Sequence, residues 1–136
     1  MSDKVLVDTN ILVYAYDADA GDKRTRAEEL IDSLWDQSTG VLATQVLSEF
    51  FITITRKVKR PLPLGEARQI IEDYRAAWGV FATTPDTVLL AVDGVERHGL
   101  SFWDAMIWAA ALINGVPKIY SEDMQHGRTH AARTDN

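Results

Sequence analysis

Four acidic side chains in this 136-residue sequence stand where they could act together: Asp8, Glu49, Asp104 and Asp123. Asp8 directly follows a short apolar run, and Asp123 comes just after another one near the end of the chain. Carboxylates that meet in one cleft repel one another and raise each other's pKa values unless cations neutralise them. Oxygen ligands of this kind favour Mg²⁺, with Mn²⁺ as a possible substitute, over zinc.

Each acid also has a simpler structural interpretation. Asp8 could serve only as a helix cap, and Asp104 stands three residues after Ser101, which is the spacing of a capping box. Glu49 could be a solvated helix residue, and Asp123 a loop acid. The helix that follows Asp104 has no polar side, however, so an ionised carboxylate there is expected to need a partner beyond one backbone amide. The four acids therefore become informative only through the elements that position them.

Short apolar runs alternate with longer helical patterns along the chain. This alternation predicts an α/β fold with a central, mainly parallel sheet of about four to five short strands, covered by helices on both faces. In such sheets ligands collect beyond the carboxyl ends of the strands, where Asp8 and Asp123 are expected to lie and where the helix carrying Asp104 begins. The expected strands span 4–7, 41–43, 80–82 and 118–120, and the expected helices span 11–16, 23–39, 45–57, 64–78, 85–98 and 101–114.

The pattern predicts one domain over residues 1–124, followed by an irregular or disordered segment over 125–136. That last segment contains only Ala131 and Ala132 as apolar residues and has no period. In the helix over 85–98, the spacing predicts an inward face made by Val88, Ala91, Val92 and Val95.

Composition excludes several classes of protein. The chain has no cysteine, so a disulfide scaffold, a thiol nucleophile and a cysteine-based zinc site are all ruled out. No Gly-rich phosphate loop and no serine nucleophile elbow is present. No apolar run is long enough for a signal peptide or a membrane span, so we expect a cytoplasmic protein with no membrane contact.

Charge limits the ways in which the chain could bind a nucleic acid. The formal net charge of −6 argues against nonspecific coating of nucleic acid, so such a partner would need bound metal ions, a local basic patch, or both. The segment 56–60 is the one dense basic cluster. Candidates to hold phosphates are Arg56, Lys57, Lys59 and Arg60, followed by Lys23, Arg24 and Arg26.

Four segments carry a family resemblance. They are VLVDTNILV over 5–13, QVLSEF over 45–50, LSFWDAMI over 100–107 and IYSEDMQHG over 119–127. In this order and at these distances they resemble the PIN-domain nucleases, and among them the VapC-like toxin ribonucleases of type II toxin–antitoxin pairs. The resemblance covers nearly the whole chain, although family members usually close the sheet with a final apolar strand and 127–136 offers no such pattern.

The resemblance implies a PIN-like three-layer α/β/α sandwich and a metal-dependent endoribonuclease whose products carry 5′-phosphate and 3′-hydroxyl ends. It also implies an RNA substrate, a cognate antitoxin protein that blocks the acidic cleft, and a homodimer. By resemblance, Asp8, Glu49, Asp104 and Asp123 surround the metal ions, with Asn10 and Ser121 as accessory polar residues.

Two other functions remain open at this point. A noncatalytic RNA-binding or partner-binding module could keep the fold and the acids without the reaction. A Mg²⁺-dependent phosphohydrolase of the haloacid-dehalogenase kind also has an aspartate after its first strand. Such an enzyme needs a second aspartate two residues further on, where this chain has Asn10.

Overall fold

Four short parallel strands form the centre of the fold. The computed structural model describes residues 2–121 and 130–131. The sheet has the order β3-β2-β1-β4-β5, and only β5 runs antiparallel to its neighbour, β4. The strands are β1 (Val5–Val7), β2 (Gly40–Ala43), β3 (Gly79–Phe81), β4 (Lys118–Tyr120) and β5 (His130–Ala131). Every residue of β1 and β2 is buried, as expected for parallel strands covered on both faces.

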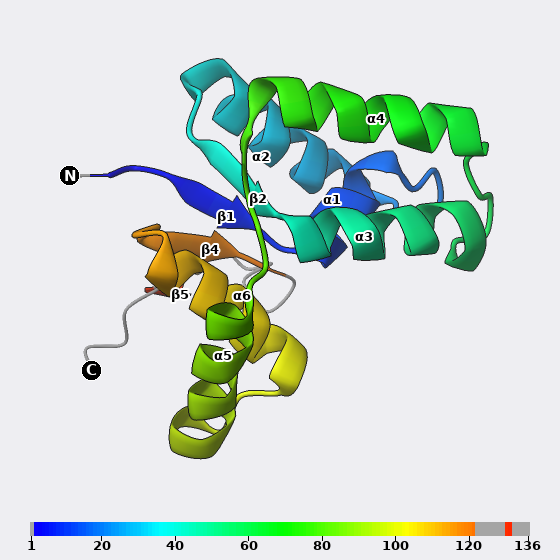
Figure 1. The fold of residues 1–136 in the computed structure, drawn as a ribbon. Coiled ribbons are helices and arrows are strands. Elements are labelled where there is room, and N and C mark those ends of the chain that lie inside the picture. The colour runs from blue at the N-terminus through cyan, green and yellow to red at the C-terminus, as the bar shows by residue number, and fades with distance from the viewer. Residues whose placement is uncertain (1, 122–129, 132–136) are drawn as a thin grey trace.

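Helices cover the sheet on two sides. Figure 1 shows α1 to α4 gathered on one side of the sheet, while α5 and α6 form a hairpin that extends from the other side. The elements are α1 (Thr9–Tyr16), α2 (Asp22–Gln37), α3 (Thr44–Ile52), the π-helix η1 (Thr53–Lys57), α4 (Leu64–Ala77), α5 (Pro85–His98) and α6 (Phe102–Ile113). The predicted α/β sandwich with a mainly parallel sheet is confirmed.

The inward face predicted for α5 is confirmed at Ala91 and wrong at the three valines, because the buried residues beside it are Thr87 and Gly94. Val88, Val92 and Val95 are 37%, 41% and 39% exposed, whereas Ala91 and Gly94 are buried. A Cβ atom placed on Gly94 would come within 3.0 Å of the Trp108 ring on α6, which shows how closely the two helices approach. Small residues therefore occupy the contact, and the larger valines are left at the surface.

An aromatic cluster holds α1, α2 and α4 together beside the sheet. Tyr74 is fully buried and packs edge to face against both Tyr16 and Trp78, and Trp35 packs against Tyr74 at 5.0 Å between ring centroids. The hydroxyls of Tyr16 and Tyr74 share a hydrogen bond of 2.9 Å. Burial raises the pKa of both phenols, so both stay neutral over the ordinary range of pH.

The end of the chain is described only in part. His130–Ala131 pairs with β4 as β5, inside the segment that the sequence predicts to be irregular. The rest of 125–136 lies outside the described residues, so a domain boundary after residue 124 stays a prediction. No helix in the described part of the chain is both long enough and apolar enough to span a bilayer.

Gly40 provides a direct test of the packing between β2 and the aromatic cluster. A Cβ atom at this position would lie 2.6 Å from the ring of Trp78, which is itself buried. We expect Gly40→Ala to lower the free energy of unfolding by about 1–3 kcal/mol, the usual cost of overpacking a core. Urea denaturation followed by circular dichroism measures this change.

Gly65→Ala is the matched control. Gly65 lies in α4 with no atom within 4 Å of an added Cβ atom, so alanine there should stabilise the helix by roughly 0.5–1 kcal/mol. Equal effects of the two substitutions would show that Gly40 is not restricted by the Trp78 ring.

Candidate active site

The sheet reverses its strand order at β1. From β1 the chain builds β2 and β3 on one side and later returns to place β4 on the other side. The carboxyl ends of β1 and β4 lie side by side, because the amide of Asp8 donates a 2.8 Å hydrogen bond to the carbonyl of Tyr120. Open α/β sheets bind ligands outside the carboxyl ends of their strands at such a reversal point. Asp8, the residue directly after β1, therefore stands at the expected place.

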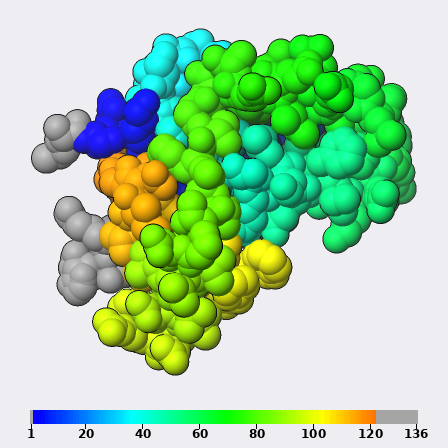
Figure 2. All heavy atoms as spheres, in the orientation of Figure 1, coloured from blue at the N-terminus to red at the C-terminus, as the bar shows by residue number. Residues whose placement is uncertain are grey.

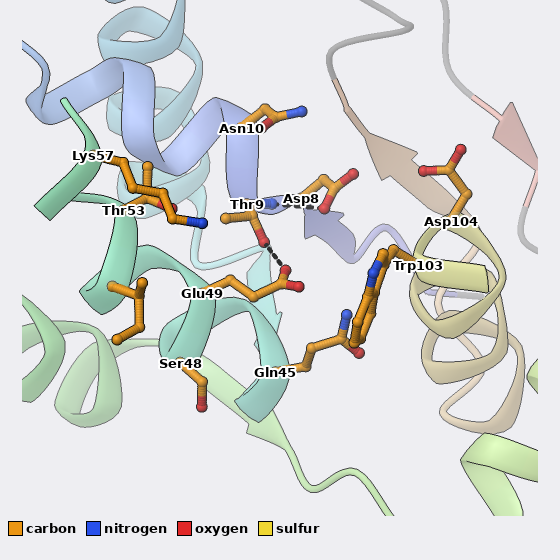
Figure 3. Close-up of a pocket in the computed structure, with 11 residues that line it drawn as sticks. Asp8, Thr9, Asn10, Gln45, Ser48, Glu49, Thr53, Lys57, Trp103 and Asp104 are labelled. Carbon is orange, nitrogen blue, oxygen red and sulfur yellow. Dashed lines mark hydrogen bonds between the residues drawn. The ribbon is translucent and has the colours of Figure 1, made fainter. Parts of the chain in front are cut away.

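A pocket of about 480 Å³ opens beside this point. Its size falls within the range of ligand pockets, roughly 300–1,000 Å³. Figure 3 shows that its walls come from the start of α1, from α3 with η1, and from the first turn of α6. The pocket is lined by Asp8, Thr9, Asn10, Gln45, Ser48, Glu49, Ile52, Thr53, Lys57, Trp103 and Asp104.

Asp8 is both a helix cap and part of the pocket. The Asp8 carboxylate accepts a 2.7 Å hydrogen bond from the amide of Thr9, which satisfies a free donor at the start of α1. A carboxylate has two oxygens and about four lone-pair positions, so one side chain can cap a helix and also bind an ion. The structural and functional interpretations of Asp8 are therefore compatible.

Glu49 is held in place from the opposite wall by a side chain of α1. Its carboxylate accepts a 2.8 Å hydrogen bond from the hydroxyl of Thr9, which is only 8% exposed. In Figure 3 this bond directs Glu49 toward the start of α1, where Asp8 stands. No pattern in the sequence predicts this role for Thr9. The feature of the sequence that could have indicated it is a hydroxyl side chain next to Asp8, at the start of the expected helix.

Asp104 reaches the same pocket from α6, but its environment differs from the expected one. The residues from Ala105 to Ala111 are buried as predicted, whereas the first turn, including Asp104, is exposed. Ser101 caps the helix, since its Oγ accepts a 3.3 Å hydrogen bond from the amide of Asp104. Within the described residues the reciprocal bond from the Asp104 carboxylate is absent, so the capping box is only half formed. The carboxylate therefore remains available to a ligand.

The acids of the pocket do not form a ready-made ion cage. In residues 2–121 and 130–131 no three His, Asp or Glu side chains lie close enough together to hold one ion. Asp123 lies outside the described residues. Mg²⁺ usually keeps several waters and binds through one or two carboxylates, so it needs no closed protein cage. The oxygen-only donor set of Asp8, Glu49 and Asp104 fits such a hydrated ion.

One member of the basic cluster faces the pocket. The helix predicted over 45–57 changes at Thr53 from α to π form, and the amide of Val58 bonds the carbonyl of Thr53 at 3.2 Å. The hydroxyl of Thr55 donates a 2.6 Å bond to the Phe51 carbonyl and so competes with the regular helical pattern. The π turn leaves Lys57 on the pocket wall, above and to the left of Glu49 in Figure 3.

The other basic candidates have different surroundings. Arg60 forms a two-pronged ion pair with Asp19, at 2.8 Å and 3.1 Å, and this hydrogen-bonded contact holds the pKa of Asp19 below its ordinary value. Arg24 pairs with Glu28 at 3.3 Å, and the Lys23 ammonium lies 5.0 Å from the centre of the Tyr14 ring. Lys57 is therefore the candidate best placed to meet a ligand in the pocket.

Two further pocket residues have no role assigned from the sequence. The Nε2 atom of Gln45 is buried and has no hydrogen-bond partner among the residues that the structure describes. The ring of Trp103 stands beside this amide in Figure 3. Of the accessory residues expected from the resemblance, Asn10 lines the pocket and Ser121 does not.

Comparisons with known proteins agree with this architecture. The family described as PIN domain matches residues 5–131. A comparison with curated proteins finds no match.

Solved structures with a similar fold include toxins and toxin complexes. The crystal structure of Mycobacterium tuberculosis VapC20, a Sarcin-Ricin loop cleaving toxin, aligns over 90% of this chain and 92% of its own, with 20% identity and a TM-score of 0.68. A toxin–antitoxin complex from Klebsiella pneumoniae covers 90% and 88% of the two chains, with 16% identity and a TM-score of 0.67. VapBC2 from Rickettsia felis, bound to a DNA fragment from its promoter, covers 90% and 89%, with 13% identity and a TM-score of 0.61.

Proposed function

The chain belongs to the PIN-domain family, and from that premise we propose that it is a divalent-metal-dependent endoribonuclease, the toxin of a toxin–antitoxin pair. One observation carries the proposal: Asp8, Glu49 and Asp104, far apart in sequence, line a single pocket at the point where the strand order reverses. The toxin described as cleaving the Sarcin-Ricin loop supports RNA as the substrate class, because it shares this fold over nearly its whole length.

The chemistry of the pocket suits hydrolysis of a phosphodiester. A bound Mg²⁺ or Mn²⁺ supplies activation of water and neutralises charge on the phosphate. Asp8 and one of Glu49 and Asp104 would bind the ion directly, and the remaining carboxylate would bind it through its waters, with Asp123 proposed as a further ligand. A carboxylate among them that is not bound to the ion could accept the proton of the attacking water. Thr9 fixes the direction of Glu49 and so limits the reorganisation that this site needs.

Lys57 is proposed to hold a phosphate of the RNA next to the carboxylates. We expect Lys57→Ala to raise KM for RNA and to reduce the salt dependence of binding, by about 0.7–0.9 in the slope of log K against log salt for one lost phosphate contact. Binding is measured by fluorescence anisotropy at several salt concentrations. The slope should stay nearly unchanged in Lys59→Ala, since Lys59 is also exposed but does not line the pocket. Equal slopes for both variants would contradict the assignment.

Partners and location follow from the same proposal. The similar structures from Klebsiella and Rickettsia are toxin–antitoxin complexes, which supports a cognate antitoxin for this chain. A homodimer and a cytoplasmic location are part of the proposal as well. The exposed apolar stripe of α5, made by Val88, Leu89, Val92 and Val95, is a candidate contact surface for the second copy.

A simple assay separates the candidate functions. The purified chain is incubated with structured RNA and with p-nitrophenyl phosphate, each with Mg²⁺, Mn²⁺ or EDTA. We expect RNA to be cut only with a divalent ion, and no nitrophenol to be released. Release of nitrophenol without RNA cutting would favour the phosphohydrolase. RNA binding without any cutting would favour the noncatalytic module.

A further inference from the structure

Trp103 is the most exposed of the four tryptophans. Trp78 and Trp108 are buried, and Trp35, which is 37% exposed, packs against the rings of Tyr74 and Trp78. Trp103 is 58% exposed, although the residues that follow it on α6, Ala105 to Ala111, form the longest unbroken buried run in the described part of the chain. An indole left in water forgoes the stabilisation of burial, roughly 1.5–3 kcal/mol for a large apolar side chain. Its exposure therefore calls for an explanation.

The position of Trp103 connects it to the candidate active site. Trp103 lines the same pocket as the carboxylates and directly precedes Asp104. Figure 3 shows its ring beside Gln45, with Glu49 and Asp104 to either side of it, while Lys57 lies across the pocket. In Figure 2 the yellow segment at the start of α6 stands out at the surface of the molecule.

The ring of Trp103 contacts a neighbouring aromatic side chain. It packs edge to face against Phe102, with 5.3 Å between ring centroids and 66° between planes. Behind it, the residues from Ala105 to Ala111 anchor α6 in the core. A side chain with two rotatable bonds on an anchored helix loses little entropy when a ligand covers it. Such a surface is suited to stacking.

From this arrangement we propose that Trp103 is a stacking platform for an unpaired nucleobase beside the phosphate to be cut. The inference rests on the proposed nuclease function and adds the kind of RNA site that it selects. Proteins read single-stranded RNA by stacking splayed bases on aromatic rings, which a base inside a duplex cannot do. The pocket would thus favour loops, bulges and ends over regular helices.

The charges around the ring favour a nucleotide over an apolar protein surface as the occupant. An apolar surface pressed onto Trp103 would also cover Glu49 and Asp104, and burying unpaired carboxylates is costly. A nucleotide can place its base on the ring and leave the carboxylates to the ion and the phosphate. Trp103 is therefore assigned to substrate positioning.

The test measures the coupling between the ring and one base. The probe is the RNA site that the wild-type chain cuts most readily in a random-sequence library, made as an oligoribonucleotide with and without a single abasic nucleotide at each position near the cut. For Trp103→Ala we expect KM to rise about 10-fold to 100-fold, with kcat largely retained. One abasic position should cause a similar loss in the wild type and no further loss in Trp103→Ala.

Two variants serve as controls. Trp103→Phe keeps a stacking face and should stay within a few-fold of the wild type. Leu64→Ala removes a similarly exposed apolar side chain at the start of α4, outside the pocket, and should not change KM. If Trp103→Ala does not fold, the abasic RNA series is measured with the wild-type chain and with Trp103→Phe. The stacking proposal is overturned if no abasic position raises KM.

Several results would overturn the stacking role. The first is an unchanged KM in Trp103→Ala. The second is a KM that rises further when the abasic RNA is combined with Trp103→Ala, so that the two effects multiply. The third is a change of oligomeric state of Trp103→Ala in sedimentation while KM stays unchanged. Failure of the nuclease proposal is distinguishable. If the wild-type chain cuts no RNA, its binding to an unstructured oligoribonucleotide is measured by fluorescence anisotropy in EDTA. Binding that depends on Trp103 and on one base supports stacking. Any other result overturns it.

Discussion

Replacing Asp8 with asparagine is expected to lower the rate of RNA cleavage by at least about 10³-fold, because a carboxylate that binds the catalytic ion becomes a neutral amide. The fold should remain intact. Asparagine is as good a helix cap as aspartate, and its side-chain oxygen can still accept the hydrogen bond from the amide of Thr9. Single-turnover cleavage in Mg²⁺ and thermal unfolding, measured on the same preparation, separate the two effects.

Asp86→Asn is the matched control for this prediction. Asp86 also lies at the start of a helix, in the first turn of α5, but does not line the pocket. Its replacement should leave cleavage unchanged and cost at most a few tenths of a kcal/mol, since it removes one exposed charge near a helix end. Cleavage that survives Asp8→Asn would point to a contaminating nuclease and remove Asp8 from the catalytic site.

The largest effect on stability is expected for Phe50→Ala. Phe50 is fully buried next to Glu49 on α3, and its ring meets Tyr16 edge to face at 5.6 Å between centroids. Removal of a buried phenylalanine ring costs about 3–5 kcal/mol, a large share of the roughly 5–15 kcal/mol that stabilises a typical domain. Urea denaturation should show this loss. Cleavage should fall as well, because α3 carries Glu49.

Phe102→Ala is the same substitution at a ring that is 39% exposed. It should lower the free energy of unfolding by about 1 kcal/mol or less, as is usual near the surface. If both alanine variants lose the same stability, Phe50 does not have the core position described above.

The fold could be predicted well from the sequence because its patterns are local. Strand 118–120 is found as β4, and the strand expected over 41–43 begins one residue earlier as β2. The face of α5 could not be predicted, because it depends on how closely α6 approaches. That distance is set by Gly94 against the Trp108 ring, which no helical spacing records.

Of the candidate site, only the acidic residues could be predicted from the sequence. Asp8, Glu49 and Asp104 were expected to converge, and they line one pocket. Their supporting residues depend on contacts between elements distant in sequence, such as the bond from Thr9 to Glu49 across 40 positions. The exposure of Trp103 could not be predicted either, since an apolar helix pattern predicts burial for the first turn of the helix too. The place of Asp123 remains a prediction.

The proposed nuclease site requires a divalent ion bound by Asp8 and at least one of Glu49 and Asp104, and crystals soaked in Mn²⁺ test this most directly. An anomalous difference map locates manganese without reference to activity. We expect a peak in this pocket within bonding distance of Asp8 and at least one of the other two carboxylates, and loss of the peak in Asp8→Asn. Manganese bound only elsewhere, or a pocket without a peak at saturating Mn²⁺, would contradict it.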